Sequence, residues 1–502
     1  MALFAALNRE GIRYCHWKSN LRLARGLSGG TDLDILVDPD DAARFQAHLG
    51  PLRIRRMLAP PGKRYPGIED YLGFDPAGGA LFHLHVHYRL VLGEQFVKNY
   101  QLPLEERFLD SARLQDGVKV PASELELMVL SLRALLKYRD RDGVKDLLGI
   151  RSPGLPAHIR EEIDWLLART TPERVREATA DLLGPALAET VERFLRAVGR
   201  PESVRDGREL LRLRRAARAG LRPYQRGGRA PAVLRYAHES ARRRNRFRFE
   251  PARKMTLPGG GLSIALVGAD GAGKTTVGRE LKSWLGRMVQ LHPYYLGSKQ
   301  PSRLSDWLYT AFRAGRRAHR GFAARFGEEN VIARTLAGGR QACLYAHYLS
   351  VGSDRYRRHR AALRSDLPAG GIVLYDRFPL EAPLDGPEIR IAAGGDNGFV
   401  ARSLAGREEA LYRRFQPPDL FLILAVDPDV SVRRKPDHSR ETIETKARLL
   451  RRLVDESDPR LAGSRLVVID AAQPLDGVLA QAREAIWDGM VARGSGGAGE
   501  QG

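Results

Sequence analysis

Cysteine is almost absent from this sequence of 502 residues. Its two cysteines, Cys15 and Cys343, lie far apart in the chain, which supports neither a disulfide framework nor a thiolate metal site. The sequence also lacks an uninterrupted apolar stretch of the roughly 20 residues that span a bilayer, and no basic segment precedes an apolar run near its start. We therefore expect a cytoplasmic protein with plain thiols.

Acidic residues are fewer than basic ones. Lys and Arg total 82 and Asp and Glu total 60, so the formal net charge is +22, which attracts polyanions. Much of the excess lies in residues 205–254, where arginines greatly outnumber acids. This segment is either a solvated connector between domains or a docking surface for nucleic acid or an anionic membrane.

The composition, with 43% hydrophobic and 28% charged residues, is that of a globular protein, and the length exceeds what one core organises. No internal repeat divides the chain. The composition changes at Pro258 and the three glycines after it, where a new domain is predicted to start. We predict an α+β domain over 1–120, a helical extension over 121–200, a basic connector over 201–260, an α/β domain over 261–490 and a disordered tail over 491–502.

Alternating apolar residues predict strands in the first part of the chain. TDLDILVD is one, and LFHLHVHYRLVL, residues 81–92, reads as a single strand of period two. Ser123 and Glu126 have the spacing of a capping box and predict a helix start. In the second part, short apolar runs such as GIVLYDRF and DLFLILAVD alternate with helical segments. That order predicts a parallel sheet with helices on both faces.

A phosphate-binding loop is predicted in the second part. Residues 268–275 satisfy G-x-x-x-x-G-K-[ST], directly after the buried run LSIALVG and before a helical pattern. Glycines let backbone N–H groups surround a phosphate, Lys274 reaches the β- and γ-phosphates, and Thr275 supplies a hydroxyl for Mg²⁺. The predicted ATP-binding residues are Gly268, Gly271, Gly273, Lys274, Thr275 and Thr276.

The loop GADGAGKTT resembles the first loop of the thymidylate kinase family, and the order of segments resembles that family over residues 262–490. The resemblance implies a P-loop NTPase fold that uses ATP and Mg²⁺, with Asp270 facing the acceptor nucleotide. Asp376-Arg377-Phe378 is similar to the family's Asp-Arg-Tyr motif, which implies that Asp376 lies near Mg²⁺ and Arg377 at the acceptor phosphate. Arg355 stands where the family has a substrate-contacting helix arginine.

Residues 418–446 resemble the family's fourth strand and its arginine-bearing lid. Phosphoryl transfer requires positive charge on the oxygens of the moving group. The candidate catalytic cations are Arg433, Arg434 and Arg440, with Lys435 beside them. Family members without an arginine in the phosphate loop use a lid arginine, and Gly271 stands where a loop arginine would. Two acceptor motifs are lacking: LHPYYLGSKQPS replaces an Arg-Glu-Pro motif and PLEAPLDGPEIR replaces a serine-containing segment.

Near the start, Trp17-Lys18-Ser19-Asn20 followed by Gly29-Gly-Thr-Asp32-Leu-Asp34 resembles the nucleotidyltransferase superfamily. Asp32 and Asp34 project to one face of a strand, which suits joint binding of Mg²⁺ and a nucleotide triphosphate. Active members generally place a third carboxylate on a neighbouring strand. The candidate strand instead has His83, His85 and His87, which pack structurally, line a nucleotide cleft, act as a base or bind a metal ion.

These motifs support one leading function and two alternatives. The leading hypothesis is transfer of the ATP γ-phosphoryl group to a nucleoside monophosphate, with dTMP as the usual acceptor in the family. One alternative is a kinase of another small metabolite, coupled to the nucleotidyltransferase-like domain. The other is a nucleotide-sensing protein that docks nucleic acid or a membrane through its basic connector.

Overall fold

The computed structural model forms two compact units, Met1–Met255 (unit 1) and Thr256–Gly502 (unit 2), and each is treated by itself. Several sequence predictions fall wholly or partly outside the described residues: part of the connector, Lys435, the segment PLEAPLDGPEIR from residue 380, and the tail from residue 494. The described part of the predicted connector is not only a solvated link, because α10 (Gly207–Gly220) buries Leu210, Leu213 and Ala217 in the core of unit 1. The structure describes residues 1–94, 97–138, 155–198, 207–226, 253–297, 301–379, 391, 399–434, 440–455 and 461–493, with a few isolated positions between 231 and 241.

Unit 1 contains a mixed five-stranded sheet in the order β1-β2-β5-β4-β3. Strands β2 and β5 are parallel and the other neighbours antiparallel. The apolar residues of β2 and β5, such as Ile35 and Val86, pack into a core with α1 (Ala2–Arg9) and α3 (Ala42–Ala47) on one face of the sheet. The strands are β1 (Tyr14–His16), β2 (Leu33–Val37), β3 (Arg55–Met57), β4 (Ile68–Asp75) and β5 (Ala80–His87).

The predicted single strand over 81–92 is wrong. Strand β5 ends at His87, and β6 (Leu90–Glu94) pairs with β7 (Val97–Leu102) in a separate two-stranded sheet. Leu90 and Leu92 leave the first core and join a second one built around the helices. Apolar and polar residues keep alternating from β5 into β6, because both strands are half buried. The local pattern therefore does not reveal the break between the two strands.

The predicted capping box is also wrong. Helix α5 (Ser123–Lys137) has Ala122 as its N-cap and no side-chain cap bond. Glu126 is buried, and its carboxylate accepts hydrogen bonds from the backbone N and the Nδ2 of Asn20, at 3.0 and 2.7 Å. The Glu126 carboxylate therefore binds Asn20, which is distant in sequence, and does not cap its own helix.

Helices supply the rest of unit 1. Helices α5, α7, α8, α9 and α10 share one core, in which Leu132, Val191 and Phe194 are buried. Their bounds and those of the remaining small elements are α1 (Ala2–Arg9), α2 (Leu23–Leu27), α3 (Ala42–Ala47), α4 (Glu105–Asp110), β8 (Arg113–Gln115), β9 (Val118–Val120), α7 (Ala157–Leu167), α8 (Pro172–Leu183), α9 (Pro185–Val198) and α10 (Gly207–Gly220).

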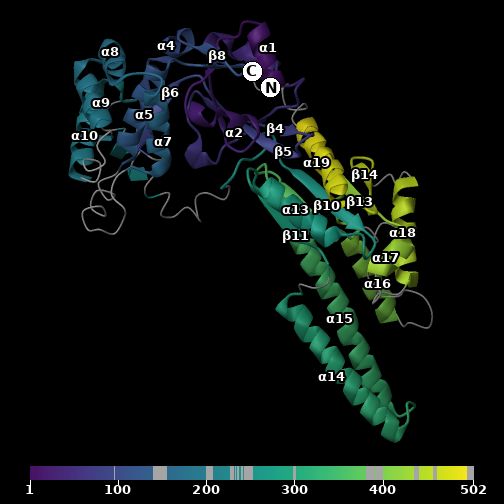
Figure 1. Cartoon of the computed structure of the whole chain (residues 1–502). Helices are drawn as coiled ribbons and strands as arrows, with labels where there is room; N and C mark the ends of the chain where they lie inside the picture. Colours follow the sequence, from purple (N-terminus) through teal and green to yellow (C-terminus); the bar gives the residue numbers. More distant parts are fainter. Residues whose placement is uncertain are drawn as a thin grey trace. The chain divides into compact units, whose positions relative to one another are not determined.

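Unit 2 has a five-stranded parallel sheet in the order β11-β12-β10-β13-β14, as the apolar runs predict. Helices α13 (Lys274–Gly286) and α19 (Leu475–Ala492) contact each other on one face (Figure 1). Residues of the opposite face, such as Val373 and Phe421, pack against Ala362 and Leu450. The predicted α/β class is confirmed. The strands are β10 (Leu262–Gly268), β11 (Leu291–Tyr295), β12 (Ile372–Asp376), β13 (Leu420–Ala425) and β14 (Arg465–Asp470).

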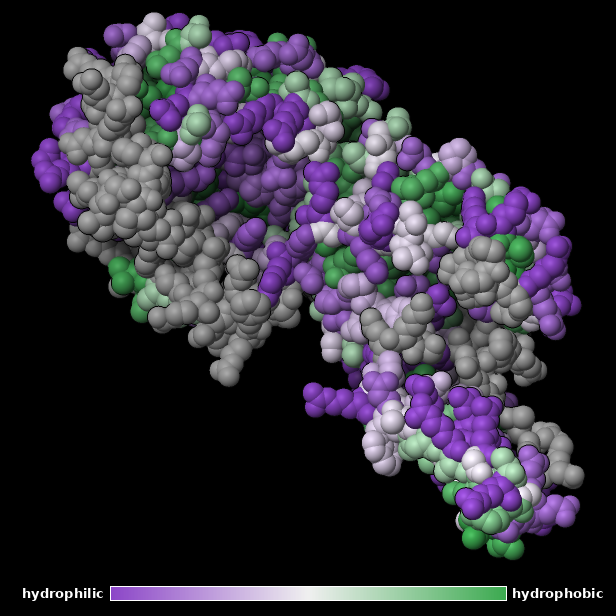
Figure 2. Space-filling model, turned by 60° about the horizontal axis from the view of Figure 1, so that its bottom comes forward, coloured by the Kyte–Doolittle hydropathy of each residue, from purple (hydrophilic) through white to green (hydrophobic). Residues whose placement is uncertain are grey.

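A long helical hairpin, α14 (Arg303–Phe326) and α15 (Val331–Ala361), extends away from this sheet (Figure 1). Figure 2 shows hydrophilic side chains interspersed with hydrophobic ones on the coloured part of the visible surface. None of the helices in the described part of the chain is long and apolar enough to cross a membrane. The other helices of unit 2 are α13 (Lys274–Gly286), α16 (Phe399–Tyr412), α17 (Pro428–Arg434), α18 (Arg440–Asp455) and α19 (Leu475–Ala492).

Candidate functional site

The predicted phosphate loop joins the central strand of unit 2 to a helix. Strand β10 ends at Gly268 and α13 begins at Lys274. Gly271 has φ +89°, and a Cβ there would lie 2.8 Å from the carbonyl oxygen of Ser431 in α17. At Gly268 a Cβ would lie 2.9 Å from the carbonyl oxygen of Leu424. Glycine is therefore required by close backbone contacts, and the N-terminus of α13 presents its N–H groups to the loop.

Lys274 lies folded over this loop. Its ammonium group donates to the carbonyl oxygens of Gly268 and Ala269, at 2.6 and 2.8 Å. Burial, together with repulsion by Arg377, lowers the pKa of Lys274 to about 8 despite the attraction of Asp270. Thr275 follows in the first turn of α13 and is exposed, so its hydroxyl is accessible.

The Asp-Arg-Phe motif lies at the same edge of the sheet as the loop. Asp376 ends β12, the parallel neighbour of β10, in register with Leu266. Arg377 adopts φ +60°, a left-handed conformation uncommon outside glycine. Its guanidinium lies 3.9 Å from Asp270 Oδ1. The carboxyl ends of two neighbouring parallel strands thus bring the two motifs together, the usual position of a ligand site in such sheets.

Asp270 is the electrostatic centre of the loop. Its carboxylate is buried and accepts from the Lys446 ammonium at 2.8 Å, with Lys274 Nζ at 4.0 Å. Burial alone would raise the pKa of Asp270, but Lys446, Lys274 and Arg377 together lower it to about 2. Lys446 belongs to α18 and was not among the predicted site residues, because nothing in the local sequence distinguishes it from neighbouring basic residues.

The predicted lid arginines have different environments. Arg433 and Arg434 end α17, and the Arg434 guanidinium donates to the carbonyl of Ala471, after β14, at 3.0 Å. Arg440 opens α18 and is exposed, with Asp429 and Glu444 each 2.7 Å away. The contact of Gly271 with Ser431 places α17 directly against the phosphate loop. Both helices therefore contact the loop: α17, which carries Arg433 and Arg434, at Gly271, and α18, which carries Arg440, through Lys446.

Arg355 is buried within α15, away from solvent. Its guanidinium donates to the hydroxyl of Tyr412 in α16 at 2.6 Å. An acceptor role for Arg355 therefore stays a prediction.

A cavity of about 530 Å³ lies beside the phosphate loop, between α18 and the ends of β13 and β14. Its lining includes Ala269, Leu424, Asp427, Leu450, Val468 and Asp470.

In unit 1, the predicted Asp34 lies at a convergence of polar groups. Its Oδ1 is 2.6 Å from Lys18 Nζ and 2.8 Å from His85 Nδ1, and His87 Nε2 lies 3.1 Å from that same Nδ1. Burial lowers the pKa of both histidines, against their hydrogen bonds to Asp34. Asp34, His85 and His87 each offer one ligand atom, and these atoms lie within 4.8 Å of one another.

Asp32 has a different partner. His83 lies between Asp32 and Asp70, with its ring nitrogens 2.9 and 2.8 Å from their carboxylates. Burial opposes protonation, but these two hydrogen bonds raise the pKa of His83 to about 9. Asp70, on β4, is a carboxylate that sequence reasoning missed, and the alternation of IEDYLGFD was its only local signal. The structure therefore gives Asp32 and Asp34 separate basic partners.

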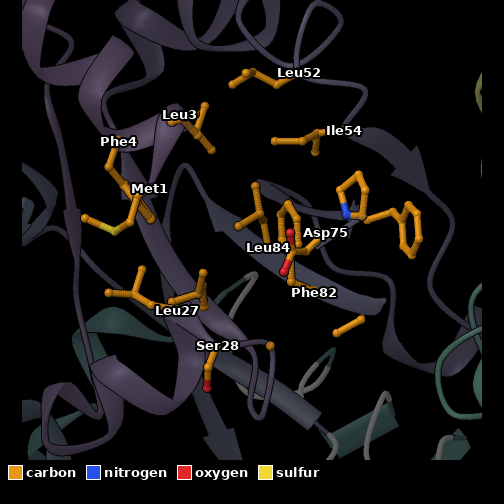
Figure 3. Close-up of a pocket in the computed structure, with 16 residues that line it drawn as sticks. Met1, Leu3, Phe4, Leu27, Ser28, Leu52, Ile54, Asp75, Phe82 and Leu84 are labelled. Carbon is orange, nitrogen blue, oxygen red and sulfur yellow. The ribbon is translucent and has the colours of Figure 1, made fainter. Parts of the chain in front are cut away.

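A cavity of about 350 Å³ lies in unit 1 on the other face of the sheet and is lined mostly by apolar residues (Figure 3). Leu3, Leu27 and Phe82 are among them. Its carboxylate, Asp75, accepts from the amides of Ala77 and Gly78 and so closes its own turn. This cavity holds no set of groups suited to phosphate or metal chemistry.

Comparisons with known proteins give distant similarity. No family model matches the chain. Two proteins of Escherichia coli strain K12 are 27% identical to it: the uncharacterized ATP-binding protein YghS, over 44% of this chain and 91% of that protein, and the uncharacterized ATP-binding protein YghR, over 44% and 86%. Among solved structures, deoxyadenosine kinase from M. mycoides with bound dATP shares 13% identity, covering 45% of this chain and 99% of that one, at a TM-score of 0.29.

Proposed function

We propose that unit 2 is an ATP-dependent kinase that transfers the γ-phosphoryl group to a nucleoside monophosphate. The observation that carries the proposal is the strand-loop-helix arrangement of residues 268–275 beside Asp376 and Arg377 at one edge of a parallel sheet. The names of the two Escherichia coli relatives agree with ATP binding.

In this proposal the phosphate loop binds the phosphates of ATP, and α17 supplies the catalytic positive charge. Backbone N–H groups at the start of α13 and the ammonium of Lys274 bind the phosphate tail, for which Lys274 exchanges its bonds to the loop carbonyls. Arg433 and Arg434 neutralise the charge that develops on the moving group. Gly271 leaves no room for a loop arginine, because a Cβ already meets Ser431. The catalytic cation therefore comes from the lid.

The oxygen groups beside the loop fit a magnesium ion. The Thr275 hydroxyl is exposed at the first turn of α13, and Asp376 ends the adjacent strand, so both are hard oxygen donors at the phosphate edge. These residues would hold Mg²⁺, which neutralises phosphate oxygens when bound. Thr276, the next residue of the helix, completes the predicted ATP-binding set.

The acceptor is assigned to the side of Asp270 and Arg377. Their side chains lie 3.9 Å apart, and Lys446 adds a third charged group. A carboxylate suits hydrogen bonding to a base or sugar, and the arginine suits binding of an acceptor phosphate. dTMP is the first acceptor to test, since the loop resembles that of thymidylate kinases.

The test is ADP production from ATP across a panel of nucleoside monophosphates. We expect acceptor-dependent ADP release by the wild type and a loss of roughly 100-fold or more in Lys274→Ala. Lys282→Ala is the matched control, because Lys282 is exposed on the same helix. A wild type that releases no ADP with any nucleoside monophosphate removes this acceptor assignment.

One observation favours an alternative acceptor. Arg355, the predicted substrate contact, is buried and donates to Tyr412. The alternative is a kinase of another small metabolite that the nucleotidyltransferase-like unit 1 also handles. A screen of small hydroxyl and phosphate compounds with labelled ATP distinguishes the two, since only one of the acceptor classes should become labelled.

A further inference from the structure

In the described part of unit 2, three cations lie around the Asp270 carboxylate of the phosphate loop. Lys446, on α18, donates to Asp270 Oδ2 at 2.8 Å. Lys274 Nζ and the Arg377 guanidinium lie 4.0 and 3.9 Å from Oδ1, which is beyond hydrogen-bonding distance. Of the three cations, Lys446 therefore makes the closest contact with this carboxylate.

Asp270 requires a close cation because it is buried. Its side chain is 6% exposed, whereas that of Lys446 is 29% exposed and reaches the loop from a neighbouring helix. A buried carboxylate that loses its partner is costly, because water no longer solvates the charge. If Lys446 were removed, Asp270 would therefore attract the next nearest cation.

Lys274 is the substitute that lies closest within the loop. It is more deeply buried than Arg377, with exposures of 11% and 35%, so solvent screens its attraction to Asp270 less. Asp376 also attracts Lys274, but less strongly than Asp270 does. A lysine held in a buried ion pair must break that pair before it can bind a phosphate group. Capture by Asp270 would thus weaken the binding of ATP by Lys274.

Two other roles for Lys446 make different predictions. It could only fasten α18 to the loop, but Ile443 and Ala447 of the same helix are buried and already hold α18 against unit 2. It could instead bind a phosphate of ATP directly. In either of these cases, removing the charge of Asp270 would not compensate for the loss of Lys446.

We propose that Lys446 is a positioning residue that neutralises Asp270 and thereby leaves Lys274 available to the phosphate chain of ATP. Lys446 acts through Asp270 and does not itself contact ATP. The inference rests on the proposed function only in that ATP binds at the phosphate loop, and it does not depend on which acceptor is used.

The experiment measures binding of Mg·ATP to the full chain by calorimetry. We expect Lys446→Met to weaken ATP binding about tenfold or more, because Asp270 captures Lys274. Adding Asp270→Asn to this variant should restore the affinity to within about threefold of the wild type, since the two residues are coupled. Lys446→Arg keeps the charge and should retain affinity. Arg448→Ala is the matched control, because Arg448 is exposed on the same helix.

Circular dichroism checks that each variant is folded, and Lys446→Gln replaces Lys446→Met if the latter is not. The proposal is overturned if Lys446→Met binds ATP as the wild type does, if Asp270→Asn does not restore its affinity, or if Arg448→Ala weakens binding equally. These outcomes leave the ATP site of the proposed function intact. A wild type that binds no ATP would remove that site, and this inference with it.

Discussion

At the scale of single residues, His83 makes stability depend on pH. Its raised pKa of about 9 reflects hydrogen bonds to Asp32 and Asp70 that outweigh burial, whereas an unfolded histidine titrates near 6.5. The stabilisation is therefore complete below about pH 6.5 and is lost as the pH rises through about 9. We expect unit 1 to lose about 1–3 kcal/mol of stability across this range.

Hydrogen exchange of peptides from β4 and β5, corrected for intrinsic rates at each pH, measures this loss. The variant His83→Gln cannot take up the proton, so its stability should vary much less between pH 6.5 and 9. Equal pH dependence in the variant and the wild type would show that another group is responsible.

Residue-level roles were only partly accessible from the sequence. Lys274, Thr275 and Asp270 lie within one continuous motif, because a phosphate loop is a local structure. Lys446, by contrast, reaches Asp270 across 176 positions of sequence. Asp70 likewise meets His83 only because β4 and β5 pair. Local patterns carry no information about which distant charges meet.

At the scale of elements, the contact between the phosphate loop and α17 can be tested at Gly271. The variant Gly271→Ala would place a Cβ 2.8 Å from the Ser431 carbonyl at φ +89°. We expect it to lower stability by about 1–2 kcal/mol and to weaken ATP binding, because the loop and α17 must separate.

Gly286→Ala is the control for this prediction. A Cβ at Gly286, the last residue of α13, meets nothing within 4 Å. It should be neutral or slightly stabilising, since alanine favours helix. Thermal unfolding and ATP titration of both variants check the prediction, and Gly271→Ala with unchanged stability and ATP affinity would contradict it.

The ends of some strands and helices could not be predicted from the periodicity of apolar residues alone. The buried runs of β10, β12 and β13 were predicted as parallel strands, because strands covered on both faces are continuously apolar. The run over 81–92 was predicted as one strand, although Tyr88 and Arg89 separate β5 from β6. Ser123 and Glu126 match a capping spacing, yet Glu126 binds Asn20. The pairing of a half-buried strand and the hydrogen-bond partner of a polar side chain depend on tertiary contacts, which local patterns do not reveal.

At the scale of the whole molecule, each unit has its own sheet and core. We predict that residues 256–502, expressed alone, fold and bind ATP within about threefold of the affinity of the full chain, because domains with separate cores fold independently. Circular dichroism and calorimetry measure both properties. An unfolded fragment, or one that has lost ATP binding, would show that unit 2 depends on unit 1.

The sequence by itself determined the local chemistry of this protein: the phosphate loop, the strand-borne Asp376 and Asp34, and the alternation that places His83, His85 and His87 on one face. These features depend on neighbours in the chain, whose geometry follows from backbone period alone. Only the tertiary structure decided the electrostatic partners, such as Lys446 with Asp270 and Asp70 with His83. Charge interactions depend on distance in space, and folding brings those residues together from separate elements.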